Sequence, residues 1–299
     1  NNNMNAQDFV RATAAYHDEL SPAAWNGNEM KPEVRIRLIE IAQLFVEYLD
    51  VAGFEVYDVV LTGSLANYNW TQFSDFDLHV VTDYRDLQSD DLAEAFYRAK
   101  KTIWNDQHDI TIYNHEVELY VEDINEPPVS GGVFSVLNGE WLKTPNHQNP
   151  NINDTAIVRK VQELEDQITR AIATADDPED LKRLTDKIGR MRRSGLDAGG
   201  EFSIENLVFK TLRNMGIIKA LHDAYHHKQD QKLSLKGLKV LVNTLLNNGE
   251  IFVKAGDVAF IKEEALHSQQ WAQKAYECNG IEGQFLIVDI NNVEFIQPS

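Results

Sequence analysis

The feature that most constrains the fold is the segment 59–81, which reads VVLTGSLANYNWTQFSDFDLHVV. It begins with a run of apolar residues, which is typical of a buried strand. A Gly63-Ser64 pair follows this run, and further along Asp75 and Asp77 alternate with apolar residues. Residues two apart on a strand face the same side. The segment therefore predicts a strand that joins a core through one face and carries two carboxylates on the other.

Two carboxylates on one strand face repel each other unless positive charge lies between them. Hard divalent cations such as Mg²⁺ and Mn²⁺ bind through oxygen ligands. Asp75 and Asp77 are therefore predicted to be metal ligands. Gly63 permits a tight turn and the close approach of a phosphate. Ser64 is predicted to begin and cap a helix, whose N-terminus favours a bound phosphate.

This arrangement resembles the nucleotidyltransferase signature of the DNA polymerase β-like superfamily. That superfamily includes poly(A) polymerases, CCA-adding enzymes, oligoadenylate synthase-like enzymes and antibiotic nucleotidyltransferases. Its pattern is a hydrophobic stretch with Gly-Ser, then Asp-x-Asp between hydrophobic residues, then a third acid on a later strand. The resemblance covers residues 60–123. The segments GSLANYNW, DFDLHVV and HEVELYVED are also similar to nucleotidyltransferases encoded by tailed phages.

Glu118 fits the third acid of the family, because it follows Val117 and precedes Leu119 in an alternating stretch. Glu116 lies two residues earlier and would share its face of the strand, so it is the alternative. The resemblance implies that Asp75, Asp77 and the third acid hold Mg²⁺ or Mn²⁺. It also implies that Gly63 and Ser64 orient a nucleoside triphosphate.

A later helix presents a second set of polar residues. Asn206, Lys210 and Arg213 recur at a spacing that places them on one helix face. The resemblance to poly(A) polymerases implies that such a helix faces the catalytic sheet, so Lys210 and Arg213 are predicted to bind the nucleotide. Ordinary surface polarity is the alternative for both. The basic residues within 182–193 are a second candidate for a phosphate contact.

The expected fold class is α/β (α+β), with a small mixed sheet and its helices followed by a mostly helical C-terminal domain. The hydrophobic periodicity changes after residue 154, and the Asn- and Pro-rich segment 144–153 is the expected linker. Residues 1–147 are therefore assigned to a catalytic domain and 148–299 to a helical nucleotide- or acceptor-binding domain. We expect a further helix at 235–247 and a pair of strands within 284–296.

Composition narrows the partners. The chain has 299 residues and a net charge of −19, which disfavours binding along an extended nucleic acid. A nucleoside triphosphate and a hydroxyl acceptor on a small molecule, a protein or an RNA end are the expected partners. No apolar run approaches the roughly 20 residues that cross a bilayer, and the single cysteine suits a reducing compartment. The expected location is the cytoplasm, or a host cytoplasm or virion for a phage protein.

The resemblance implies an enzyme that transfers a nucleoside monophosphate from the triphosphate to the acceptor and releases pyrophosphate. Two alternatives stay open. One is a catalytically quiet binding or structural protein, such as a phage component, that keeps the fold. The other is a toxin-like enzyme that nucleotidylates a host protein or tRNA.

Overall fold

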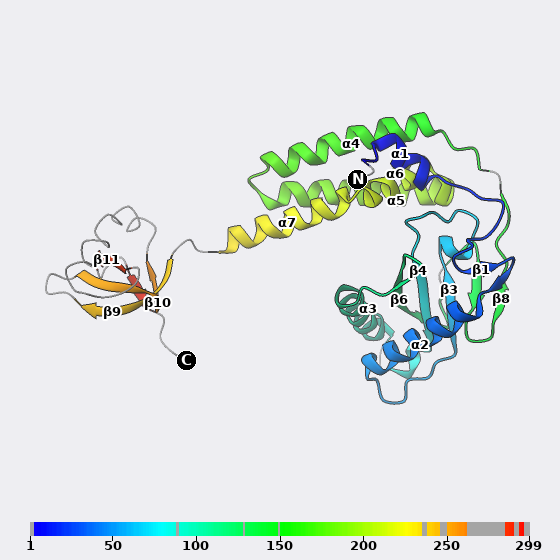
Figure 1. Cartoon of the computed structure of the whole chain (residues 1–299), viewed down its shortest axis with the longest axis horizontal. Coiled ribbons are helices and arrows are strands. Elements are labelled where there is room, and N and C mark those ends of the chain that lie inside the picture. Colours follow the sequence, from blue (N-terminus) through cyan, green and yellow to red (C-terminus); the bar gives the residue numbers. More distant parts are fainter. Residues whose placement is uncertain are drawn as a thin grey trace. The chain divides into compact units, whose positions relative to one another are not determined.

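A mixed sheet is the centre of the first part of the molecule, shown in the computed structural model in Figure 1. In the described part of the chain this sheet has six strands in the order β5-β6-β4-β3-β7-β8. The neighbouring strands β4 and β6 run parallel, and every other pair is antiparallel. The strands are β3 (Asp58–Thr62), β4 (Phe76–Thr82), β5 (Thr111–Ile112), β6 (His115–Asp123), β7 (Val133–Ser135) and β8 (Glu140–Lys143).

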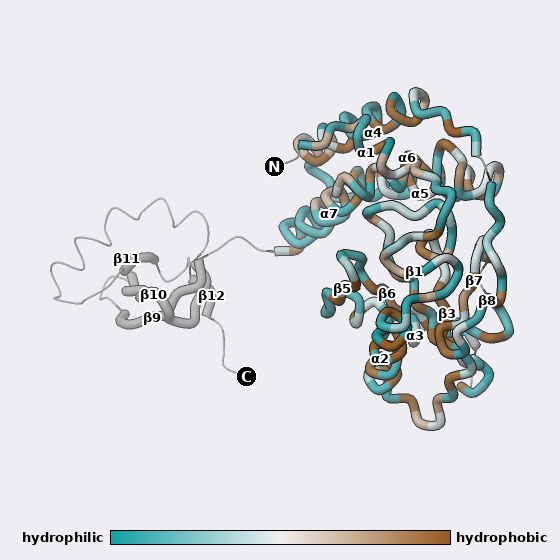
Figure 2. Tube along the Cα trace, turned by 45° about the vertical axis from the view of Figure 1, so that its right-hand side comes forward, coloured by the Kyte–Doolittle hydropathy of each residue, from teal (hydrophilic) through white to brown (hydrophobic). Residues whose placement is uncertain are grey.

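Two helices, α2 (Pro32–Leu49) and α3 (Asp90–Gln107), pack against the sheet. On β4 the alternate residues Phe76, Leu78 and Val80 are fully buried. They join one core with the apolar residues that recur every three or four positions along α2, such as Phe45. Figure 2 shows these apolar segments gathered where α2 and α3 meet the strands.

A side chain on α3 completes the edge of β6. The amide of Asn105 donates to the carbonyl of Leu119 and accepts from the Leu119 N–H, both at 3.0 Å. A neighbouring strand would satisfy the same two groups. This pair of hydrogen bonds fixes the position of β6 along α3. The strand β6 carries the predicted third acid.

The helices that follow the sheet form a separate layer with its own core. They are α4 (Asp154–Thr174), α5 (Pro178–Gly199), α6 (Ile204–Asn214) and α7 (Ile217–Leu233). The N-terminal helix α1 (Ala6–Thr13) belongs to this layer rather than to the sheet, because Val10 is buried among residues of α4 and α6. Two short strands, β1 (Trp25–Asn26) and β2 (Glu29–Met30), pair with each other.

The structure describes residues 3–87, 90–127, 129–148, 150–234, 238–245, 250–261, 285–289 and 293–295. The chain forms two compact units, one ending at Ala224 and the other beginning at Tyr225. The expected linker at 144–153 lies inside the first unit, where it joins the sheet to the helices. None of the helices within the described residues is long and apolar enough to cross a membrane.

The second unit contains strands, so the helix expected at 235–247 is wrong. Residues within it form β9 (Leu238–Leu245), which pairs with β10 (Glu250–Ile261). The β-branched residues Val240, Val242 and Thr244 alternate along this segment, and that pattern favours a strand over a helix. The tail strands β11 (Phe285–Asp289) and β12 (Val293–Phe295) lie where expected, but each pairs with β10 rather than with the other.

The expected α+β class is confirmed, with a mixed sheet followed by a helical region that ends at Leu233.

Candidate active site

Asp75 and Asp77 lie at the start of β4, on the face of the sheet opposite the core formed with α2. Phe76 and Leu78 alternate with them and are fully buried, whereas both carboxylates are half-buried. The strand geometry predicted from the sequence is therefore present, and it points two carboxylates to one side of the sheet.

Glu118 lies on the neighbouring parallel strand, directly opposite Asp77 in the register of β4 and β6. It is half-buried and lines the same cavity as the two aspartates. Glu116 is exposed, pairs with Thr111 of β5 and does not line that cavity. The structure therefore brings Glu118, rather than Glu116, beside the acid pair.

Gly63 turns the chain at the end of β3 with a φ of +81°, which favours glycine. A Cβ atom added there would overlap Oδ2 of Asp77. The sequence suggested that this glycine makes room for a phosphate. In the structure it makes room first for the Asp77 carboxylate, which any larger residue would displace.

Ser64 does not begin the expected helix. It starts a single 3₁₀ turn, η1 (Ser64–Ala66), and its side chain caps no helix. Instead its hydroxyl lies 2.7 Å from the hydroxyl of Ser74, which also accepts from the N–H of Thr71 at 2.8 Å. These bonds tie the two ends of the loop 64–74 together directly before the acids, so Ser64 fixes where β4 begins.

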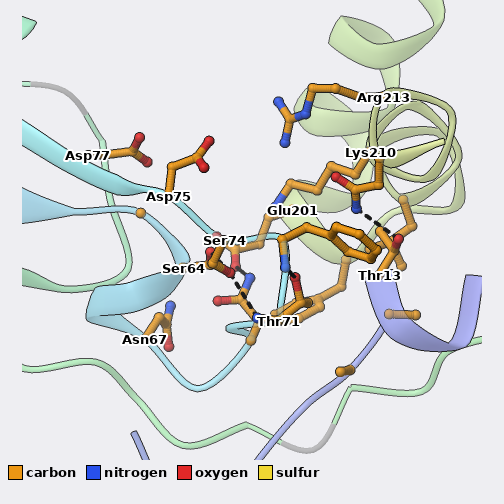
Figure 3. Close-up of a pocket in the computed structure, with 18 of the residues that line it drawn as sticks. Thr13, Ser64, Asn67, Thr71, Ser74, Asp75, Asp77, Glu201, Lys210 and Arg213 are labelled. Carbon is orange, nitrogen blue, oxygen red and sulfur yellow. Dashed lines mark hydrogen bonds between the residues drawn. The ribbon is translucent and has the colours of Figure 1, made fainter. Parts of the chain in front are cut away.

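These residues share one cavity of about 410 Å³ between the sheet and the helical layer. A volume of this size is in the range of small-molecule sites. Figure 3 shows Asp75 and Asp77 on the strand side, with Lys210 and Arg213 extending from the helix opposite. Every residue predicted for the site lines this cavity, namely Gly63, Ser64, Asp75, Asp77, Glu118, Lys210 and Arg213.

The helical wall of the cavity carries a third cation, Arg192 of α5, beside Lys210 and Arg213 of α6. The guanidinium groups of Arg192 and Arg213 lie 4.3 and 5.9 Å from the ring centre of Phe209. Among the described residues, none of these three cations forms an ion pair with a carboxylate. Their charge is therefore available to an anionic ligand.

A buried amide orients Arg192. Asn206 is almost fully buried, and its Oδ1 accepts from Nε of Arg192 at 3.3 Å while its Nδ2 donates to the carbonyl of Glu201 at 2.7 Å. Asn206 therefore orients Arg192, a residue of the cavity wall. The carboxylate of Glu201 lines the cavity and accepts a hydrogen bond from Asn69, which links the helical layer to the loop before the acids.

The cations across the cavity, Arg213 and Lys210, offset the negative charge of the acid pair only in part. Burial, followed by repulsion from Glu118, raises the pKa of both Asp75 and Asp77 to about 7. Neither carboxylate forms an ion pair within the described residues. No three acidic, His or Cys side chains of the described chain converge as a ready metal cluster. The arrangement is thus a carboxylate pair with Glu118 beside it, and its all-oxygen donor set suits a hard divalent cation.

Sequence reasoning left several cavity residues unassigned. Arg192 was one of many cations in the run 182–193, and helical spacing alone did not separate it from Arg190 or Arg193. Those two do not line the cavity. In the sequence, Tyr120 shows only the alternation of a strand, and Glu201 shows only a glycine pair before it. Their place in the cavity depends on how the sheet packs against the helices, which neither pattern predicts.

No family model matches the chain, and no curated protein matches it. Among solved structures, the chain is similar to a STING-associated CdnE c-di-GMP synthase from Capnocytophaga granulosa, at 12% identity and a TM-score of 0.18. The alignment covers 77% of this chain and 89% of that one.

Proposed function

We propose that the protein is a metal-dependent nucleotidyltransferase, which moves a nucleoside monophosphate from a nucleoside triphosphate to a hydroxyl group. The observation that carries the proposal is the cavity in which Asp75 and Asp77 of one strand face Lys210 and Arg213 of a helix. Negative groups for a cation and positive groups for a polyphosphate thus line a single space.

Mg²⁺ or Mn²⁺ is the cofactor that this donor set fits. Asp75 and Asp77 would hold the cation, and Glu118 on the adjacent strand would supply the third carboxylate. When bound, such a cation polarises phosphoryl oxygens and lowers the pKa of an attacking hydroxyl. It would also offset the burial and the carboxylate repulsion that raise the pKa values of the pair.

The cations of the helical wall would bind the triphosphate. Lys210, Arg213 and Arg192 supply three positive charges without competing ion pairs in the described chain. Burial lowers the pKa of Lys210, while the nearby Glu201 carboxylate opposes that effect. A triphosphate would add negative charge at this point and hold Lys210 in its charged form.

In the proposed reaction the acceptor oxygen forms a bond to the α-phosphorus while the bond to the bridging oxygen breaks. Pyrophosphate leaves with the electron pair of that bond, and the proton of the acceptor hydroxyl passes to a carboxylate or to water. The role of Lys210, Arg213 and Arg192 is to stabilise the charge that grows on the leaving group. The acceptor is a hydroxyl of a small molecule, a protein or an RNA end.

The test compares the parent with an Asp75→Asn, Asp77→Asn double variant. The parent should melt at a higher temperature with Mn²⁺ and a nucleoside triphosphate, and should release pyrophosphate when an acceptor from a cell lysate is present. The double variant should lose both effects. Asp106→Asn, which changes an exposed carboxylate on α3, is the matched control and should keep them.

Two results would overturn the proposal. Equal stabilisation of the parent and the double variant by Mn²⁺ and triphosphate would show that the acids bind no cation with the nucleotide. Nucleotide binding without pyrophosphate release, in the presence of every acceptor fraction, would favour a binding protein that keeps the fold.

A further inference from the structure

The side chain of Tyr120 is held in place by three contacts. Its ring stacks on the imidazole of His79, with ring centres 4.8 Å apart and an angle of 18° between the planes. The ammonium group of Lys101 lies 4.4 Å from the ring centre of Tyr120. The phenol hydroxyl donates to Oε2 of Glu118 at 2.7 Å. The ring therefore has little freedom to move while its hydroxyl binds the third acid.

His79, which stacks on the Tyr120 ring, is itself held by neighbouring side chains. His79 lies opposite Tyr120 in the register of β4 and β6. One nitrogen of its imidazole is 3.0 Å from the Thr62 hydroxyl, and the other is 3.4 Å from a carboxylate oxygen of Glu122. Strands β3, β4 and β6 thus all contribute to holding Tyr120 in place.

The hydrogen bond occupies only one oxygen of Glu118. Among the described residues, the other oxygen has no hydrogen-bond partner. A carboxylate held at one oxygen cannot rotate freely, and it loses less conformational entropy when the second oxygen binds a ligand.

We propose that Tyr120 is a positioning residue, which holds one oxygen of Glu118 so that the other is presented to the cavity beside Asp77. This inference rests on the proposed function. It predicts that Tyr120 acts through Glu118 rather than by direct contact with the triphosphate of the nucleotide.

The test is Tyr120→Phe, which keeps the stacked ring and removes the hydrogen bond. We expect kcat to fall roughly 10- to 100-fold, as for the loss of a hydrogen bond to a charged group, while KM for the nucleotide stays within about twofold of the parent value. Mn²⁺ affinity, measured by calorimetry with a non-hydrolysable triphosphate, should fall as well. Tyr84→Phe is the matched control, because the Tyr84 hydroxyl donates to the Val121 carbonyl at 2.9 Å outside the cavity.

A double-variant cycle separates positioning from a general structural effect. If Tyr120 acts through Glu118, then Glu118→Ala combined with Tyr120→Phe should be no worse than Glu118→Ala alone. Fully additive losses would overturn the inference, as would parent-like kcat and Mn²⁺ affinity in Tyr120→Phe. If Tyr120→Phe folds poorly, Lys101→Leu loosens the ring from the α3 side and should change both quantities in the same direction.

The two proposals fail in different ways. If the parent transfers nucleotide and Tyr120→Phe matches it, only the inference about Tyr120 is wrong. If the parent transfers no nucleotide to any acceptor, the proposed function is wrong. The Mn²⁺ affinities then decide the inference, since weaker binding by Tyr120→Phe supports it and equal binding overturns it.

Discussion

Asp77 gives the folded protein a pH dependence of definite sign. Its pKa is raised from 3.8 to about 7, first by burial and then by nearby carboxylates. The folded state therefore keeps a proton that the unfolded state releases, and stability falls as the pH rises between these two values. Asp77→Asn stays neutral, so without metal it should melt at a higher temperature than the parent at about pH 8, with the gap shrinking toward about pH 4.

Thermal unfolding followed by circular dichroism in metal-free buffer checks this. Asp106→Asn, at an exposed position on α3, is the control for the substitution itself. A gap for Asp77→Asn that stays the same at both pH values would contradict the assignment of the raised pKa.

Arg192 should matter more than its neighbour in sequence. Arg192 lines the cavity, whereas Arg193 is exposed and does not. Arg192→Ala should lose about 1.5–3 kcal/mol of triphosphate binding, as for one charge-assisted contact, which is roughly a tenfold to hundredfold loss in affinity. Titration of Mn²⁺ and a non-hydrolysable triphosphate by calorimetry measures it. Equal affinities for Arg192→Ala and Arg193→Ala would remove Arg192 from the site.

At the scale of elements, α1 is part of the helical core although it comes first in the sequence. Val10 is fully buried with residues of α4 and α6. Val10→Ala should lower the free energy of unfolding by about 2 kcal/mol, from the lost apolar contacts and the cavity left behind. Gln7→Ala, on the exposed side of the same helix, should change it by less than about 0.5 kcal/mol. Chemical denaturation compares the two, and equal losses would contradict this packing.

The sequence predicted correctly the features that follow from the order of neighbouring residues. The alternation around Asp75 and Asp77 fixed a strand face, because side-chain direction on a strand follows from sequence position alone. Two predictions were wrong, the helix start at Ser64 and the helix at 235–247. At Ser64 the reason is that a Gly-Ser pair suits a 3₁₀ turn as well as a helix start. In 235–247 the leucines obscured a period-two pattern of β-branched residues.

At the scale of the whole molecule, the site depends on how separate layers meet, and no local pattern contains that information. The alternation along β6 places Tyr120 on the same face as Glu118, but it does not show that the Tyr120 hydroxyl reaches Glu118. The helix face of Lys210 and Arg213 was predictable, yet what that face lies against was not. Arg192 lines the cavity with Lys210 and Arg213 because α5 packs against α6.

The cavity belongs entirely to the first compact unit, because every residue that lines it precedes Tyr225. A chain that ends at Ser234, after α7, should therefore keep the melting transition of that unit and its stabilisation by Mn²⁺ and triphosphate. Differential scanning calorimetry of the shortened and full chains tests this. Loss of the ligand-induced shift on shortening would show that residues beyond 234 contribute to nucleotide binding.

The most direct test of the account follows the label of a nucleoside triphosphate that carries ³²P at either the α or the γ position. With Mg²⁺ or Mn²⁺ and a cell lysate as the source of acceptor, α-label should become attached to the acceptor and γ-label should appear in pyrophosphate. Asp75→Asn combined with Asp77→Asn should abolish both. Transfer of the γ-label to an acceptor, or α-labelling that survives in the double variant, would contradict nucleotidyl transfer at this acid pair.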